Sequence, residues 1–424
     1  MKALNGLALA TLVCLLNTHS ATAEPVVIGG GTPPGLERNG PDQPSSAPPD
    51  NLQRGERVLG GAGQGRVAER VTESEAIAAL ADQLDRQTAA DMFAGAVMVS
   101  RDGETIFATA EGYADIERQI PNDVDTAFGI GSMGKMFTGT AVLQLVQAGR
   151  INLDDPLSTY LPDYPNEAMA AATIHQLLTH TAGAGNIFGP DEIELFNANR
   201  EDLTEPEDFI ALFGERSPRF EPGSRWEYSN YGFILLGRVI EAVSGESYFN
   251  YVRKHIFQPA GMNATDNYPV NELPPKTAIG YTRVPPGERL SGHPAGGQLP
   301  PLRPNTDSLP YRGGPAGGGY STVGDLIRFA TALRENKLLD EEHTELLMAG
   351  KVASMGSSKY AYGFSDELSG DGVRMVGHNG GAPGIYGQLT IFPDSGYVVA
   401  VLANRDPQGA IGVIESISSR LPAK

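Results

Sequence analysis

The chain carries one β-hairpin pattern near its start and another near its end. Residues 95–115, GAVMVSRDGETIFATAEGYAD, contain two strand-like runs on either side of an Asp102-Gly103 turn. Residues 387–406, GQLTIFPDSGYVVAVLANRD, repeat this pattern close to the C-terminus. Such runs joined by short turns are typical of antiparallel hairpins. We therefore expect both ends of the chain to build one antiparallel sheet, with the intervening residues leaving the sheet and returning.

Most of the intervening chain shows helical spacing of apolar residues, for example in residues 173–183, 207–214 and 232–257. The sequence therefore predicts an α/β (α+β) fold, in which helices flank an antiparallel sheet and a mostly helical region is inserted. We expect residues 71–152 and 311–424 to form the α/β part and residues 153–310 the helical insertion.

A Pro- and Gly-rich segment, residues 265–316, is long for a connection without periodicity. We interpret it as a loop system that borders a functional site, and a disordered insertion is the alternative.

The N-terminus predicts export. Lys2 precedes an apolar run and then Ala21-Thr22-Ala23, which fits a signal peptide over residues 1–23 that is cleaved after Ala23. Residues 24–70 are rich in Gly, Pro and polar residues, so we expect a flexible leader. A capping box of Thr72 and Glu75 then predicts the first ordered helix. The mature protein would be periplasmic or secreted.

Composition excludes several classes of function. The only cysteine is Cys14, inside the predicted signal, so disulfides, a thiol nucleophile and cysteine metal sites are excluded in the mature chain. The net charge of −19 disfavours nucleic acid as a partner. No second apolar run has the length of a membrane span. Neither a metal-ligand spacing nor a nucleotide-binding motif is present, so we expect no cofactor and no metal.

Residues 128–149, FGIGSMGKMFTGTAVLQLVQAG, read as a short loop followed by an apolar helix. Ser132 stands at the junction, where a serine ordinarily caps the first turn. A capping box would place Glu or Gln three residues later, but Lys135 stands there, where the helix dipole disfavours a cation. Desolvation and the helix N-terminus favour an uncharged lysine, which could take the serine proton. This placement, more than the common S-x-x-K spacing, makes Ser132 a candidate nucleophile.

A proton relay is the next requirement, and three Y-x-N matches occur, at Tyr164, Tyr228 and Tyr248. Tyr164 lies in a proline loop and Tyr248 inside a predicted amphipathic helix. Tyr228 follows a Pro-Gly turn and lies just before the N-terminus of a predicted helix, a setting like that of Ser132. A tyrosine between two cations has a lowered pKa and can relay protons, and Asn230 can hydrogen-bond both a lysine and a substrate carbonyl.

A third motif precedes the C-terminal hairpin, in MVGHNGGAPG at residues 375–384. It offers His378 together with glycines that would let a substrate backbone approach. The other histidines favour structural roles, and His180 in LLTHTAG is expected to satisfy buried backbone groups. We expect Trp226 to pack beneath Tyr228 rather than to bind substrate.

SMGK, YSN and HNG, in this order, resemble the three signatures of the penicillin-recognising serine hydrolases. The branch that the chain resembles most contains class C β-lactamases, D-alanyl-D-alanine carboxypeptidases, D-aminopeptidases and related esterases. Supporting stretches, among them INLDDPLSTYLPDYP and GPAGGGYSTVGDLIRFATAL, extend the resemblance from about Val71 to Arg420.

The resemblance implies a role for each matching residue. Ser132 would be acylated, Lys135 and Tyr228 would share the proton transfers, and Asn230 would orient the substrate. His378 takes the position of the third-motif cation, and the backbone N–H groups of Ser132 and Gly381 would bind the oxyanion. The chain departs from β-lactamases in having His378 where they carry Lys-Thr-Gly. A histidine is mostly neutral at pH 7 but would still donate one hydrogen bond to the substrate.

These features together predict an exported serine hydrolase that works through an acyl-enzyme. Its substrate would be a D- or non-standard peptide, a related amide or a small ester. A class C-like β-lactamase, and a penicillin-binding module with slow turnover, remain open alternatives. The oligomeric state is open.

Overall fold

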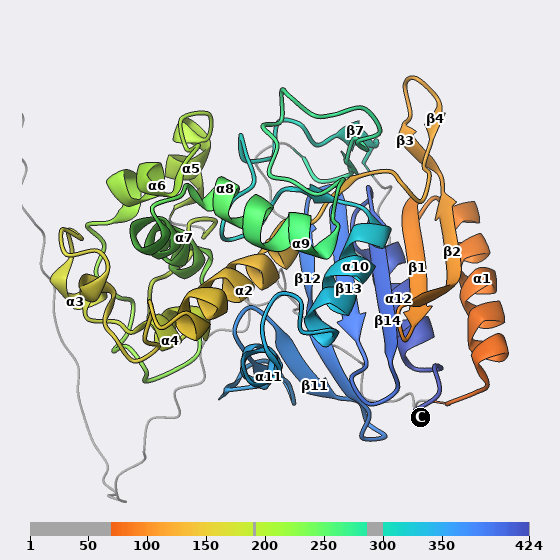
Figure 1. The fold of residues 1–424 in the computed structure, drawn as a ribbon. Helices are drawn as coiled ribbons and strands as arrows, with labels where there is room; N and C mark the ends of the chain where they lie inside the picture. Colours follow the sequence, from red (N-terminus) through yellow and green to blue (C-terminus); the bar gives the residue numbers. More distant parts are fainter. Residues whose placement is uncertain (1–68, 190–191, 286–299, 424) are drawn as a thin grey trace, which may run out of the picture. The chain divides into compact units, whose positions relative to one another are not determined.

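The computed structural model describes residues 69–189, 192–285 and 300–423. Its largest element is an antiparallel sheet of eight strands in the order β2-β1-β14-β13-β12-β11-β10-β9 (Figure 1). The strands are β1 Gly95–Arg101, β2 Glu104–Glu111, β9 Val352–Ala353, β10 Lys359–Tyr360, β11 Ser365–Leu368, β12 Arg374–Ala382, β13 Ile385–Ile391 and β14 Tyr397–Ala403.

The first and last hairpins meet inside this sheet, as the sequence predicts. β1 pairs with β14 from Gly95 opposite Ala403 to Arg101 opposite Tyr397. The turn between β1 and β2 has positive φ at both Asp102 and Gly103, which suits the right-handed twist of a two-residue hairpin. The predicted fold class is therefore confirmed.

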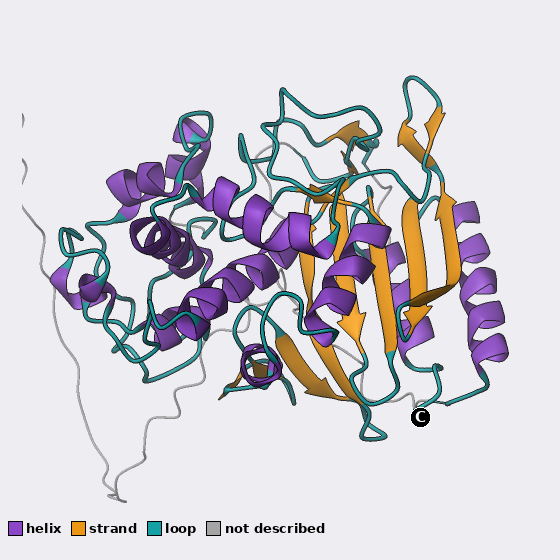
Figure 2. Cartoon of the chain, viewed as in Figure 1, coloured by secondary structure: helices purple, strands orange, loops and turns teal. Residues whose placement is uncertain are grey.

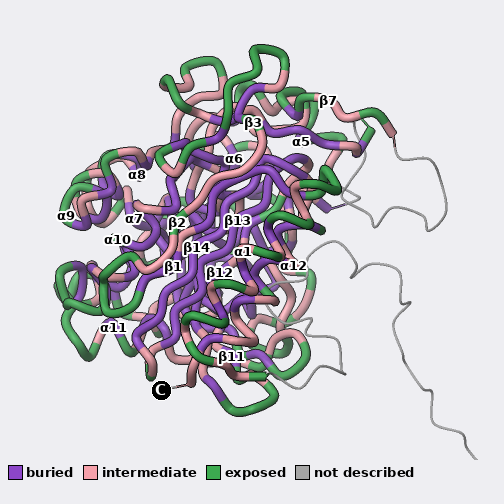
Figure 3. Tube along the Cα trace, turned by 90° about the vertical axis from the view of Figure 1, so that its right-hand side faces the viewer, coloured by how far each residue is buried: buried purple, intermediate pink, exposed green. Residues whose placement is uncertain are grey.

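Helices cover both faces of the sheet (Figure 2). α1 (Glu73–Ala89) and α12 (Gln408–Ser418) contact each other and lie on one face, where Val399 and Val401 of β14 join their apolar cluster. α10 (Val323–Arg334) lies on the other face, where Ala400 and Leu402 join a second cluster. Alternate residues of a strand point to opposite faces, so β14 is buried along its whole length (Figure 3).

Helix α1 begins at the predicted capping box. The Thr72 hydroxyl accepts the backbone N–H of Glu75, and the Glu75 carboxylate accepts the backbone N–H of Thr72. Arg70, just before it, pairs with Asp371 at 2.7 Å. The predicted signal peptide, and the predicted leader up to residue 68, lie outside the described residues.

The inserted helices pack around the apolar helix α7 (Asn230–Ser244), which also contacts α2 (Gly134–Gln147) from the part of the chain before the insertion. The other helices of this region are α3 Glu167–Ala170, α4 Ile174–Leu178, α5 Ile193–Asn199, α6 Pro206–Phe213, α8 Tyr248–Val252 and α9 Gln258–Ala260, and α11 Glu341–Met348 lies between α10 and β9 in sequence. No helix in the described ranges combines the length and apolar character needed to cross a membrane.

Three two-stranded sheets complete the described strands. β3 (Tyr113–Asp115) pairs with β4 (Ile120–Pro121), and β6 (Tyr281–Thr282) pairs with β7 (Arg303–Pro304). β5 (Phe128–Gly129) pairs with β8 (Tyr320–Ser321). β5 lies just before Ser132 in the chain, so its pairing with β8 helps to fix the position of the serine loop.

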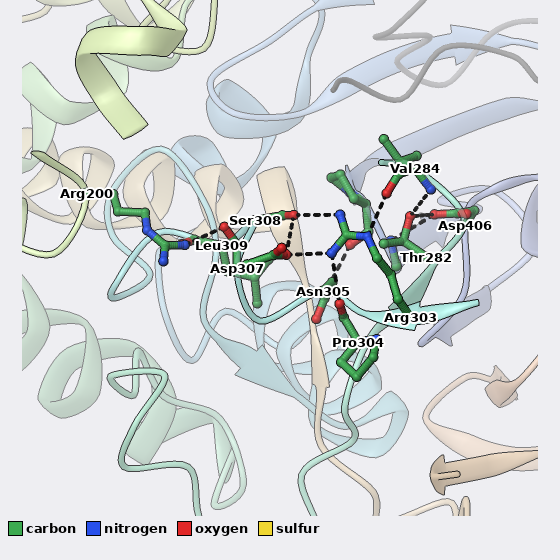
Figure 4. Close-up of polar contacts among 12 residues, drawn as sticks. Arg200, Thr282, Val284, Arg303, Pro304, Asn305, Asp307, Ser308, Leu309 and Asp406 are labelled. Atoms are coloured by element: carbon green, nitrogen blue, oxygen red, sulfur yellow. Dashed lines mark hydrogen bonds and ion pairs between the residues drawn. The ribbon is translucent and has the colours of Figure 1, made fainter. Parts of the chain in front are cut away.

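The described parts of the 265–316 segment are tied to the end of β12. Arg303 pairs with Asp307 at 2.6 Å and also donates to the carbonyl of Val284 (Figure 4). Asn305 donates to the carbonyl of Pro383, in the turn after β12, at 2.8 Å. This hydrogen bond ties the segment to the turn that follows the third motif.

Candidate active site

Ser132 lies in a single 3₁₀ turn, Gly131–Met133, that leads directly into α2. Neither the turn nor the helix is capped by a side-chain hydrogen bond. The Ser132 hydroxyl is therefore not engaged as a helix cap. It is partly exposed and lies 3.4 Å from Nζ of Lys135, one turn further along the chain.

Lys135 is fully buried. Its Nζ donates to Asn230 Oδ1 at 2.6 Å and to the carbonyl of Ala316. Both of these oxygens can only accept, so Nζ donates one N–H to each of them. The remaining tetrahedral position on Nζ faces the Ser132 hydroxyl. In the amine form the lone pair at this position can accept the serine proton, which is the role that the sequence indicated.

Tyr228 is the one of the three Y-x-N tyrosines that lies beside Lys135. Nζ of Lys135 lies 4.8 Å from the centre of the Tyr228 ring. The Tyr164 hydroxyl instead pairs with that of Tyr231 at 3.1 Å, and the Tyr248 hydroxyl pairs with Thr138 Oγ1 at 2.8 Å. Both of these tyrosines are buried, and burial raises the pKa of each.

Asn230 is the first residue of α7, and Ser229 caps this helix by accepting the N–H of Gly232 at 2.9 Å. The Asn230 amide donates to Asn186 Oδ1 at 3.0 Å, while its own Oδ1 faces Lys135. Asn186 was not singled out in the sequence. Its Oδ1 also accepts the N–H of Phe188, which fixes the orientation of both amides.

A glycine-rich segment, residues 313–319, holds the start of α2, and residues 313–316 of it belong to the loop system that the sequence predicted to border a site. Besides the Ala316 carbonyl at Lys135, Gly318 donates its N–H to the carbonyl of Gly131 at 2.8 Å. Gly317 has a φ of +138°, and a Cβ there would lie 2.6 Å from the Gly131 carbonyl oxygen. The run GGPAGGG was the available signal, because only residues without Cβ allow this close backbone approach.

β12 lies against the serine loop. β11 pairs with residues 374–377 of β12, whereas β13 also pairs with residues 378–382, so this second half has a strand partner on one side only. A Cβ on Gly380 would lie 1.9 Å from the Ile130 carbonyl oxygen and 2.7 Å from the Ser132 nitrogen. Gly381 is exposed, and a Cβ there would find no heavy atom closer than 3.9 Å.

His378 is buried, and both of its ring nitrogens have partners inside the protein. Nδ1 lies at the Asn379 carbonyl oxygen, which can only accept, so Nδ1 carries the proton. Nε2 lies 3.0 Å from the Tyr360 hydroxyl and therefore accepts from it. Burial, with a further contribution from Lys135, lowers the pKa of His378 to about 3. The hydrogen bond expected to go to a substrate is therefore made to Asn379.

His180 and Trp226 lie under Tyr228. The N–H of Ser229 donates to Nδ1 of His180 at 3.1 Å, so this histidine does satisfy a buried backbone group, as the sequence indicated. Trp226 packs 6.5 Å from Tyr228 between ring centres. Within residues 69–189, 192–285 and 300–423, no three His, Cys, Asp or Glu side chains gather as a metal site.

Comparisons with known proteins agree with this arrangement. Residues 77–418 match the family described as Beta-lactamase. PbpX of Bacillus subtilis (strain 168), a penicillin-binding protein by name, is 33% identical over 315 residues, which cover 73% of this chain and 70% of PbpX. The penicillin binding protein from Bacillus halodurans has a TM-score of 0.70 at 33% identity, with 80% of this chain and 98% of that chain covered. A D-stereospecific amidohydrolase from Streptomyces sp. has a TM-score of 0.65 at 29% identity, with 80% and 97% covered.

The fold and the order of the three motifs define a penicillin-recognising serine hydrolase class. The chain belongs to the Beta-lactamase family, which includes penicillin-binding proteins and serine hydrolases such as D-amino acid amidases.

Proposed function

We propose that this protein is an exported hydrolase that forms an acyl-enzyme on Ser132 and acts on small amides or esters, with amides of D- or non-standard amino acids as the leading class. The observation that carries the chemistry is the position of Lys135, whose Nζ lies between Ser132 Oγ and Asn230 Oδ1. Names of relatives support the amide class, since two solved structures are called D-stereospecific amidohydrolase and D-amino acid amidase.

Acylation would begin when Oγ of Ser132 attacks the substrate carbonyl carbon. The hydroxyl proton passes to the pair of Lys135 and Tyr228 and then to the leaving nitrogen or oxygen, as its bond to the carbonyl carbon breaks. In deacylation a water molecule attacks the ester carbon, the bond to Oγ breaks, and a proton returns to Oγ. Each step leaves Lys135 and Tyr228 in their starting protonation states.

The developing oxyanion needs two N–H donors, and we assign this role to the backbone of Ser132 and Gly381. Among the described strands, none pairs with residues 378–382 of β12 on the side where β11 ends. An extended substrate can align along such a strand edge through main-chain hydrogen bonds. Asn230, held by Lys135 and Asn186, would orient the substrate amide.

The environment of His378 argues for an uncharged substrate. A lysine in this position would supply a fixed positive charge for a substrate carboxylate. His378 is neutral and gives its one N–H to Asn379. We therefore expect amides and esters without a carboxylate next to the scissile bond to be preferred over anionic β-lactams.

A penicillin-binding module with slow turnover is the second candidate. It is favoured by the names of PbpX and of the Bacillus halodurans structure. Both functions acylate Ser132, and they differ in the rate at which the acyl group is released.

A screen of p-nitrophenyl esters, D-amino-acid amides and a chromogenic cephalosporin separates these functions. We expect turnover of amides or short esters and weak turnover of the cephalosporin. If kcat/KM for the cephalosporin reaches ~10⁴ to 10⁸ M⁻¹s⁻¹ while the other rates stay near background, the protein is a β-lactamase. Stable acylation without release would identify the penicillin-binding module. Export is tested by sequencing the N-terminus of the mature protein, which we expect to begin at Glu24.

A further inference from the structure

His180 has a left-handed backbone conformation, which is uncommon for residues other than glycine. It follows Thr179, the residue that caps the C-terminus of α4, and has a φ of +60°. The next residue, Thr181, donates its N–H back to the carbonyl of Gln176, a pattern that closes the helix end. Glycine ordinarily fills this left-handed position, and asparagine, aspartate and histidine are the side chains that take it more often than others. A strained residue that persists in such a position suggests a role beyond ending the helix.

The hydrogen bonds and the ring contact that His180 makes indicate this role. The N–H of Glu227 donates to the His180 carbonyl at 3.0 Å, and the N–H of Ser229 donates to His180 Nδ1 at 3.1 Å. These two N–H groups flank Tyr228 on either side. The His180 ring also packs on the Tyr228 ring, with 4.4 Å between centres. One residue thus holds the backbone N–H of both sequence neighbours of Tyr228 and packs against the Tyr228 ring.

The hydrogen bond from Ser229 requires a neutral imidazole, because a protonated ring has no free lone pair at Nδ1. The proton then sits on Nε2, which has no hydrogen-bond partner among the described residues. The imidazole ring of His180 is surrounded by the aromatic rings of Tyr228, Tyr360 and Phe233, whose centres lie 4.4 to 5.1 Å from its own centre. Burial, together with Lys135 and His378, lowers the pKa of His180 well below its ordinary value. The acceptor at Nδ1 is therefore available throughout the neutral range.

We propose that His180 is a positioning residue, which holds the Tyr228 hydroxyl in the geometry needed for proton transfer with Lys135. This inference rests on the proposed function of Tyr228. A displacement of about 1 Å at a reacting group can lower a rate about 10²-fold. Loss of the contacts between His180 and the Tyr228 segment should therefore lower kcat while changing KM little.

Two substitutions test the proposal, because both suit the positive φ. His180→Asn keeps a side-chain acceptor near the Ser229 N–H, whereas His180→Gly removes the acceptor and the ring together. We expect His180→Gly to lower kcat about 10²-fold, and His180→Asn to recover about tenfold of that loss. His175→Asn, on the preceding turn, is the matched control, since His175 pairs with Tyr362 and not with the Tyr228 segment. It should keep wild-type kcat.

All rates are divided by the amount of Ser132 that a fluorophosphonate labels, so that unfolded protein does not enter the comparison. A kcat per labelled site within about twofold of wild type in His180→Gly would overturn the proposal, as would equal losses in His180→Asn and His180→Gly. If the glycine variant does not fold, His180→Asn is compared with His175→Asn, and kcat values within about twofold of each other would overturn the proposal. A wild-type protein without labelling or turnover would instead contradict the proposed function itself.

Discussion

Nζ of Lys135 lies 2.6 Å from Oδ1 of Asn230, and this contact joins the first turns of two helices that begin almost a hundred residues apart. Lys135 comes from α2 and Asn230 from α7, and both side chains are buried. The contact brings the first and second motifs together, with Ser132 on one side and Tyr228 on the other. A charged or polar pair buried in this way is stable only when its hydrogen bonds are made, so the two helices are held in one relative position.

The first prediction concerns Tyr228. Tyr228→Phe should lower kcat/KM by ~10²- to 10⁴-fold, because the ring remains while the proton-transferring hydroxyl is lost. Tyr164→Phe and Tyr248→Phe are matched controls, since their hydroxyls pair with Tyr231 and Thr138 away from Lys135. We expect these two variants to keep wild-type kcat/KM and to lose stability. An equal loss of activity in Tyr164→Phe would show that the proton relay lies elsewhere.

Neighbouring glycines on β12 provide the second prediction. Gly380→Ala should abolish most activity, because a Cβ would collide with the Ile130 carbonyl and the Ser132 nitrogen. Gly381→Ala should be far milder, since there is room for a Cβ and the proposed oxyanion donor is a backbone N–H. Steady-state kinetics on the best substrate measure both. Inactivity of Gly381→Ala with full activity of Gly380→Ala would contradict the placement of this strand.

The third prediction is a pH dependence of stability. The pKa of His378 is about 3 in the folded protein and near its ordinary 6.5 in the unfolded chain. Between these values the unfolded state binds more protons, so the free energy of unfolding falls as the pH falls. The slope for one histidine approaches ~1.4 kcal/mol per pH unit. His180 shifts in the same direction.

Urea denaturation at about pH 7 and about pH 5 tests this. Wild-type protein should lose up to about 2 kcal/mol more stability over this range than His378→Gln, which removes the titrating ring. Using the difference between the two proteins cancels the contribution of carboxylates common to both. Identical pH slopes would mean that His378 is accessible and titrates normally.

Local patterns predicted the sheet, and they singled out three motifs whose side chains lie near one another in the structure. Period-two runs around Asp102-Gly103 and before Asn404 indicated the hairpins, and both lie in the sheet. The setting of each Y-x-N match, rather than the match itself, distinguished Tyr228 from Tyr164. Such features are readable because they depend on residues close together in sequence.

Contacts between residues far apart in the sequence could not be predicted from such local patterns. The Ala316 carbonyl accepts from Lys135 because of the course of the backbone, and the alanine side chain gives no sign of this contact in the sequence. Asn186 lies in a loop without a distinguishing pattern, yet it fixes the amide of Asn230. For His378 the sequence suggested a neutral donor to substrate, but it could not show that Asn379 and Tyr360 occupy both nitrogens.

The central claim is that Ser132 is the acylated nucleophile, and covalent labelling tests it most directly. The protein is treated with a fluorophosphonate, its intact mass is measured, and the modified peptide is mapped, with Ser132→Ala as the control. We predict a single adduct on the peptide that contains Ser132 and no adduct on the Ser132→Ala protein. An adduct that persists in Ser132→Ala, or that maps to another serine, would contradict the account.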